Sequence, residues 1–120
     1  MTIDNSVTEI GQQAFAYCTS LTSVALGSGI TTINVAAFYG CSSLTSITIP
    51  ENVTSIRDQA FGECSSLTSI TCEAVTPPTL DLYNDYLPNF QVVYVPAESV
   101  EAYKQATNWS YYSDIIQAIS

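Results

Sequence analysis

One short stretch, AFGECSSLTSIT, recurs at a fixed interval, and this repeat constrains the fold more than any other feature of the chain. It begins at Ala60, and its relatives AFYGCSSLTSIT and AFAYCTSLTSVA begin at Ala37 and Ala14, so the interval is 23 residues. A fixed period in this range is typical of folds in which successive turns of the chain stack, each burying its apolar side against its neighbours. The sequence therefore predicts a stack of short repeats.

The apolar residues recur strictly in this register, while the positions between them vary. The recurring columns are Val7, Ile30 and Val53; Ile10, Ile33 and Ile56; Ala14, Ala37 and Ala60; Phe15, Phe38 and Phe61; Cys18, Cys41 and Cys64; Leu21, Leu44 and Leu67; Val24, Ile47 and Ile70; and Leu26, Ile49 and Cys72. Because Phe38 lies between Phe15 and Phe61 in this order, we expect its side chain to fill the centre of the stack.

The register also reaches beyond the three clear repeats. In FQVVYVP it predicts the strand of a fourth, degenerate repeat, whose inward residues are Leu87, Phe90, Val93 and Val95. The first half of that repeat, TPPTLDLYNDY, has lost the pattern. At the start of the chain the register aligns Ile3 with Leu26, so MTID is expected to be the tail of a strand from a preceding repeat.

Each repeat has a recognisable local structure. The segment LTSITIP alternates apolar and polar residues, as a half-buried strand does, and Pro50 should end that strand. The segment VTSIRDQAFGECSS is expected to form a short strand and then a tight helical turn. After Pro96, AESVEAYKQATNW is predicted to be a helix with Val100, Tyr103 and Ala106 on one face, placed to cover the last repeat.

We expect these parts to form a single domain. Its predicted divisions are the tail of a truncated preceding repeat at 1–6, repeats at 7–29, 30–52 and 53–75, the degenerate repeat at 76–96, and the C-terminal cap at 97–120.

The pattern IxxxAFxxCxxLTSIxIP, repeated at this spacing, resembles the BspA-like, or treponemal-type, leucine-rich repeat. The ending YVPAESVEAYKQATNW resembles the C-terminal cap of many bacterial members of that family, so the resemblance extends from Ile3 to Ile119. It implies a leucine-rich-repeat solenoid, a right-handed superhelix rich in β-structure with short helical turns, built of about four repeats and a C-terminal helical cap. It also implies a place on bacterial cell surfaces and a role in adhesion and protein binding.

Charged residues are few and almost all acidic. Eleven carboxylates stand against Arg57 and Lys104 alone, which leaves a net charge of −9. Such a chain repels phosphate backbones and anionic membranes, so we expect no nucleic acid partner. The complete absence of histidine removes the commonest general base and the commonest metal ligand. We therefore expect no catalytic residues, no cofactor and no metal site.

The location of the protein is predicted from the resemblance. No apolar run approaches the ~18 residues that span a bilayer, so direct membrane insertion is not expected. The start MTIDNSVTEI lacks the basic and apolar regions of a signal peptide. We expect an extracellular or cell-surface protein of which this chain is a fragment.

Four cysteines raise the question of disulfides. Cys18, Cys41 and Cys64 share one column, so they should lie about 4.8 Å apart, one strand spacing, along the stack. Three residues in a column cannot all pair, and Cys72 occupies a core position of another column. A column also spreads thiolates too widely for zinc. We expect Cys18, Cys41 and Cys64 to be reduced and buried as small core residues.

Two surface features are candidates for binding. In DLYNDYLPN, Asp81, Asn84 and Asp85 can supply calcium ligands, although a polar loop without metal is the favoured interpretation because the spacing of an EF-hand is missing. The other candidate is the outward side of the predicted strands, a face of small residues that are suited to flat ligands or to plain strand formation. Its members are Ser23, Ala25, Ser46, Thr48, Ser69 and Thr71. Ice binding is disfavoured because the repeats are few and uneven.

The predicted function is a non-enzymatic binding module that recognises a protein or glycan ligand on another cell or on host matrix. The alternatives are a structural spacer in a larger surface protein and, more remotely, an enzyme. Self-association is also expected, because the first repeat would show one side of Ile10, Phe15, Leu21 and Val24 to solvent beside an unpaired strand edge.

Overall fold

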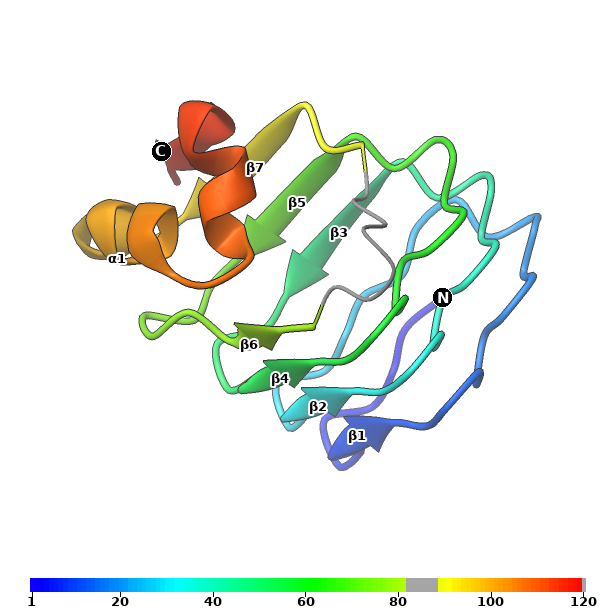
Figure 1. Ribbon diagram of the computed structural model, residues 1–120. Helices are drawn as coiled ribbons and strands as arrows, with labels where there is room; N and C mark the ends of the chain where they lie inside the picture. The colour runs from blue at the N-terminus through cyan, green and yellow to red at the C-terminus, as the bar shows by residue number, and fades with distance from the viewer. Residues whose placement is uncertain (82–88, 120) are drawn as a thin grey trace.

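Two four-stranded parallel sheets face each other in the structure, a computed structural model that describes residues 1–81 and 89–119. The short-strand sheet lies at the bottom of Figure 1, and the long-strand sheet lies above it. The short-strand sheet has the order β1 (Glu9–Ile10), β2 (Thr32–Ile33), β4 (Ser55–Ile56) and β6 (Thr79–Leu80). The long-strand sheet has the order β3 (Ser46–Ile49), β5 (Ser69–Cys72), β7 (Val92–Val95) and β8 (Ile116–Ala118).

The pairing of these strands confirms the repeat register. Ile10 pairs with Ile33 and Ile33 with Ile56 in one sheet, while Ile47 pairs with Ile70 and Ile70 with Val93 in the other. Because only one face of each strand is buried, a slip by one residue would turn every apolar side chain outward, and the apolar columns therefore set the register.

The segment predicted to be a degenerate repeat departs from this spacing. Ser55 pairs with Thr79, so β6 is displaced by one residue from the 23-residue interval. Phe90, Val93 and Val95 are buried as expected, while Leu87 lies outside the described residues. The strand β3 ends at Ile49, immediately before Pro50, in agreement with the prediction.

The core lies between the two sheets and contains a stack of phenylalanine rings. The ring centroids of Phe15 and Phe38 are 5.4 Å apart with an interplanar angle of 13°, and those of Phe38 and Phe61 are 5.6 Å apart with an angle of 7°. The side chain of Phe38 is 0% exposed, which confirms its predicted central position.

Tight turns rather than a continuous helix surround these rings. The amide of Cys41 donates to the carbonyl of Phe38 within the turn, at 3.2 Å, and the amide of Phe38 donates to the carbonyl of Ala60 in the next repeat, at 2.8 Å. Left-handed backbone recurs at two positions of the repeat. These positions are Gln13, Ala36 and Gln59, with φ of 57°, 55° and 56°, and Tyr17, Gly40 and Glu63, with φ of 60°, 75° and 54°.

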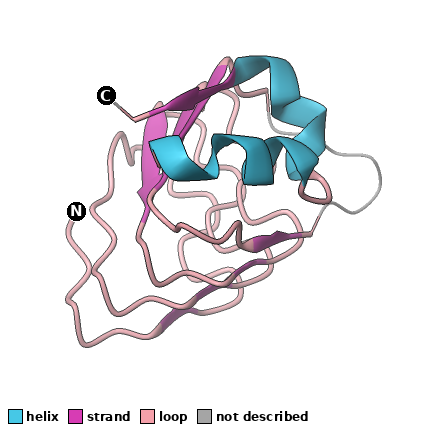
Figure 2. Ribbon diagram, turned by 90° about the vertical axis from the view of Figure 1, so that its left-hand side faces the viewer, coloured by secondary structure: helices cyan, strands magenta, loops and turns pink. Residues whose placement is uncertain are grey.

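A C-terminal cap packs against the last repeat, and Figure 2 shows its helices at one end of the stacked strands. It consists of η1 (Ala97–Ser99), α1 (Val100–Gln105), η2 (Trp109–Ile115) and the strand β8. The helix predicted after Pro96 is thus present, with Tyr103 buried and Val100 and Ala106 half-buried.

Side chains of the cap bind backbone carbonyls of β6 and of the segment that joins β5 to β6. The hydroxyl of Tyr103 donates to the carbonyl of Ala74 at 2.6 Å, and the indole N–H of Trp109 donates to the carbonyl of Pro78 at 2.8 Å. Ser99 Oγ donates to the carbonyl of Val75 at 2.6 Å, and Asn108 Nδ2 donates to the carbonyl of Leu80 at 2.5 Å. These side chains satisfy carbonyls that a further repeat would otherwise meet with its own amides.

The start of the chain corrects one prediction. Ile10 and Val24, expected to be open on one side, are only 3% and 8% exposed. Next to Val24, residues 1–3 pair with the first repeat: Ile3 N donates to Ala25 O, and Ala25 N donates to Met1 O, both at 2.9 Å. Phe15 and Leu21 are half-buried, so the apolar end of the stack is partly open.

Candidate binding face

The outward side chains of the long-strand sheet form a regular surface, here called the binding face. Alternation along the strands buries Ile47 and Ile70 and turns the neighbouring residues outward. One row runs from Ser46 to Ser69 to Val92, and a second runs from Thr48 to Thr71 to Tyr94 and on to Gln117. Four of the six predicted face residues therefore lie in direct register with one another.

The other two predicted residues, Ser23 and Ala25, are exposed but lie outside this ladder. Ala25 forms an isolated parallel bridge with Thr2. Among the described residues, no backbone hydrogen bond joins 23–26 to β3. Ser23 and Ala25 therefore remain predicted members of the face.

Sequence analysis did not predict three residues of the face, namely Val92, Tyr94 and Gln117. The signal was available, because each lies one repeat interval beyond a residue already on the face. The half-buried Tyr94 is the most important of them, because it adds an aromatic ring to a surface otherwise made of small hydroxyl groups. Tyrosine is enriched at protein interfaces, whereas serine is depleted there.

A pocket of about 460 Å³ lies at the carboxyl end of this face and is called the end pocket. Glu73 lies two residues beyond Thr71 and is exposed, so the second row of the face continues into the pocket there, whereas Pro50, two residues beyond Thr48, is buried and contributes to the pocket wall. Its lining residues are Leu26, Ser28, Pro50, Glu51, Glu73 and Ile119.

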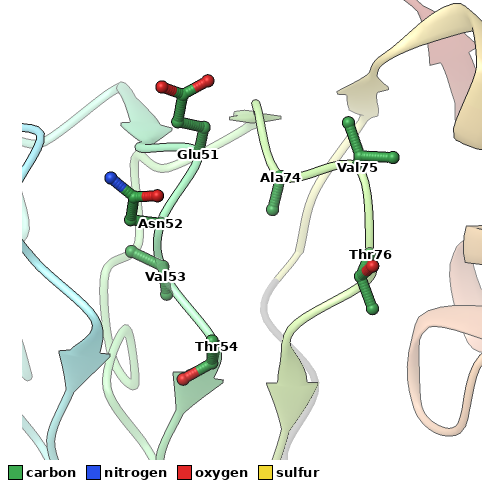
Figure 3. Close-up of a pocket in the computed structure, with 7 residues that line it drawn as sticks. All are labelled: Glu51, Asn52, Val53, Thr54, Ala74, Val75 and Thr76. Atoms are coloured by element: carbon green, nitrogen blue, oxygen red, sulfur yellow. The ribbon is translucent and has the colours of Figure 1, made fainter.

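A second pocket, the turn pocket, adjoins it and shares Glu51. Its volume is about 350 Å³, and Figure 3 shows it between the segment Glu51–Thr54 and the segment Ala74–Thr76. Two backbone hydrogen bonds flank the gap, from Glu73 N to Ile49 O at 3.0 Å and from Thr79 N to Thr54 O at 2.9 Å.

The cap explains why the two segments stay apart. The carbonyls of Ala74 and Val75 accept hydrogen bonds from Tyr103 and Ser99, which lie on the far side of that segment. The corresponding turns of the first two repeats are joined instead, because Asn52 Nδ2 donates to Ser28 O at 2.9 Å. The turn pocket therefore depends on the anchoring of the 74–78 segment to the cap.

The charges of the end pocket have no internal counterion among the described residues. Glu51 and Glu73 are exposed, and neither forms an ion pair or a side-chain hydrogen bond with another described residue. Arg57 is bound elsewhere, with its Nε 3.2 Å from Asp81 Oδ2 at the edge of the short-strand sheet.

The proposed calcium ligands are only partly visible. Asp81 pairs with Arg57, whereas Asn84 and Asp85 lie outside the described residues. Within the described ranges, no group of three or more Cys, Asp or Glu side chains is arranged to hold a metal ion.

Comparison with known proteins agrees with the parallel repeats. The family model described as BspA type Leucine rich repeat region (6 copies) matches residues 1–87. The chain belongs to this family. The resemblance found in the sequence is thus confirmed, and the fold is a leucine-rich-repeat fold with parallel strands and few helices.

A solved structure is similar to this BspA-type chain. It is a leucine rich cell surface protein from Faecalibacterium prausnitzii A2-165, with 29% sequence identity and a TM-score of 0.61. The alignment covers 82% of this chain and 36% of the other, so the BspA-type chain spans about a third of that protein's length. No curated protein matches the chain. Over the described residues, no helix has the length and apolar character needed to cross a bilayer.

The cysteine column of this BspA-type repeat has a polar role that sequence reasoning missed. Cys41 Sγ donates to the carbonyl of Phe15 at 3.2 Å, and Cys64 Sγ donates to the carbonyl of Phe38 at 3.1 Å. The same carbonyls also accept the amide hydrogens of Cys18 and Cys41 at 3.2 Å, so each thiol adds a second donor to a carbonyl of the preceding repeat, which an alanine or valine cannot do.

The thiols are free, and burial suppresses their reactivity. Cys41, Cys64 and Cys72 are buried, while Cys18 is only half-buried, contrary to expectation. Burial raises the pKa of Cys41 and Cys72, and it raises the pKa of Cys64 to about 12. These three thiols are protonated at neutral pH and are unsuited to nucleophilic chemistry.

Proposed function

We propose that the chain is a non-enzymatic binding module of a bacterial surface or secreted protein, and that its binding face takes part in adhesion or protein–protein interaction. In this proposal the repeats are about four turns of a right-handed solenoid closed by the C-terminal cap. The ligand is a protein or glycan on another cell or in host matrix. The similarity to a cell surface protein supports the extracellular location.

The observation that carries the proposal is the continuous outward row Thr48, Thr71, Tyr94 and Gln117. These residues stand on hydrogen-bonded strands, so a ligand meets them without first ordering a loop, which reduces the entropic cost of binding. Hydroxyl and amide groups supply hydrogen bonds, and Tyr94 supplies aromatic contact area. Small polar groups beside an aromatic ring suit either a protein surface or a sugar.

An enzymatic role has little support in the residues. The sequence contains no histidine to activate a serine, and three of the four thiols have raised pKa values. The carboxylates of the end pocket are exposed, whereas general acid catalysis uses a carboxyl in a buried, apolar site.

The test is a binding screen of the purified chain against arrays of host matrix proteins and glycans. For any ligand found, Thr71→Arg and Tyr94→Ala should each weaken binding at least about tenfold, as expected for interface anchors. Thr32→Arg is a matched control, because Thr32 occupies the same half-buried outward position on the short-strand sheet. Tyr111→Ala controls for loss of an exposed tyrosine. Binding that is insensitive to both face substitutions would refute the proposal, and a chain with no ligand would favour the spacer.

Self-association is a separate part of the proposal. The outer edge of β1 pairs with no other described strand, and Phe15, Cys18 and Leu21 are half-buried beside it. An unpaired strand edge next to apolar side chains favours pairing with a second copy of the chain.

A further inference from the structure

We propose that the end pocket binds a lysine or arginine side chain of the partner protein. This inference rests on the proposed function, because it names the partner chemistry for one end of the binding face. The two groups that would hold the cationic head are the carboxylates of Glu51 and Glu73, both of which line the pocket.

The lining of the end pocket fits the two parts of a basic side chain. Leu26, Pro50 and Ile119 supply apolar surface, while the two glutamates supply negative charge at the same opening. Lysine and arginine combine an aliphatic stem with a charged head, and they bury the stem along apolar surface while the head stays at a polar position. A purely apolar ligand would leave both carboxylates desolvated without a partner, and an acidic one would be repelled.

The charge distribution of the whole chain favours a basic partner over an internal counterion. The chain has two basic residues, and Arg57 is already paired with Asp81 at the other sheet. The net charge of −9 would accelerate the approach of a basic segment. A metal ion is a poorer occupant, because the described residues contain no cluster of three metal-ligating side chains.

The neighbouring turn pocket gives the backbone of such a segment a place to bind. Figure 3 shows the Glu51 carboxylate at its rim, projecting away from Val53 and Thr54, so Glu51 separates the two pockets. No backbone hydrogen bond spans the gap between 51–53 and 74–76 within the described residues, so the two segments leave space between them. A basic side chain in the end pocket can therefore extend into a segment of peptide that lies along the turn pocket.

The experiment is a two-dimensional 1H–15N NMR titration of the whole chain with tetralysine, and in parallel with tetralysine acetylated on its side-chain amines. We expect tetralysine to shift the backbone amides of Glu51, Glu73 and Ile119 most strongly, and the acetylated peptide to shift none of them. The double variant Glu51→Gln/Glu73→Gln should lose about tenfold in affinity, as expected for two partly screened ion pairs.

The matched control is Glu101→Gln/Asp114→Asn, which removes the same charge from exposed positions on α1 and η2. It should change the affinity by less than about twofold, because distant exposed charges are screened. Equal losses in the two double variants, or shifts spread over all the carboxylates, would show only non-specific attraction and overturn the inference, as would the absence of binding.

The two proposals fail in different ways. If the array ligand requires Tyr94 but is indifferent to Glu51→Gln/Glu73→Gln, the inference fails and the proposed function stands. If tetralysine binds in the end pocket but Thr71→Arg and Tyr94→Ala do not affect any array ligand, the proposed function fails instead.

Discussion

Replacing Phe38 with alanine tests the stacked core more directly than any other substitution. The Phe38 ring is fully buried, and it is the only one of the three stacked rings with a phenylalanine on both sides, at centroid distances of 5.4 and 5.6 Å. Phe15 has one such neighbour and is half-buried. Removing the Phe38 ring therefore leaves a cavity and removes two ring contacts at once.

The expected loss in the free energy of unfolding is large for a small domain. Truncation of a buried phenylalanine typically costs about 3–5 kcal/mol, including the cavity that is left. Each aromatic pair adds about 0.5–1.5 kcal/mol beyond its buried area, which places Phe38→Ala towards the upper end of that range. With total stabilities of about 5–15 kcal/mol in natural domains, the variant is expected to remain folded only marginally. At about 4 °C for each kcal/mol, the melting temperature should fall by ~15 °C.

The assay is urea and thermal unfolding followed by circular dichroism, with Tyr39→Ala as the neighbouring control. Tyr39 is half-buried and packs edge to face on Tyr17, at a centroid distance of 5.6 Å. Its truncation should cost about 1–2 kcal/mol, in the ordinary range for point substitutions. If Phe38→Ala does not fold, the free energy of unfolding of Phe38→Leu should lie between that of the wild-type protein and zero. Equal destabilisation at Phe38 and Tyr39 would refute the assignment of Phe38 to the centre of the stack.

Four further predictions follow from the burial or exposure of particular groups. In an Ellman titration of the native protein only Cys18 should react, whereas all four thiols should react in denaturant. Burial raises the pKa of Cys64 from 9.0 to about 12. The contribution of the Cys64 thiol to the free energy of unfolding should therefore be complete below pH 9.0 and lost as the pH rises towards 12. The Tyr103→Phe substitution leaves a buried carbonyl without its donor and should cost about 1–3 kcal/mol in urea unfolding, whereas Tyr111→Phe at an exposed position should cost almost nothing. Light scattering at high protein concentration should detect self-association that Leu21→Arg reduces, and a strictly monomeric wild-type protein would contradict an open apolar end.

The sequence alone determined the repeat, its register and most of the core. An apolar residue at every equivalent position can be buried only if successive repeats stack in parallel, so the pairing of Ile47 with Ile70 follows from the period itself. Phe38 was placed at the centre of the stack for the same reason. Four residues of the binding face were predicted because side chains alternate along a strand. These predictions needed only nearest neighbours in the stack.

Only the tertiary structure decided the features that break the period. Val24 is buried because residues 1–3 pair with Ala25, and Cys41 bonds to the Phe15 carbonyl, a contact that the spacing of the columns does not show. The turn pocket arises because Ser99 and Tyr103 of the cap bind carbonyls 24 and 29 residues earlier in the chain. Contacts of this kind join segments of different sequence, and they form only when the cap packs against the repeats. A periodic pattern predicts only the contacts between equivalent positions of successive repeats.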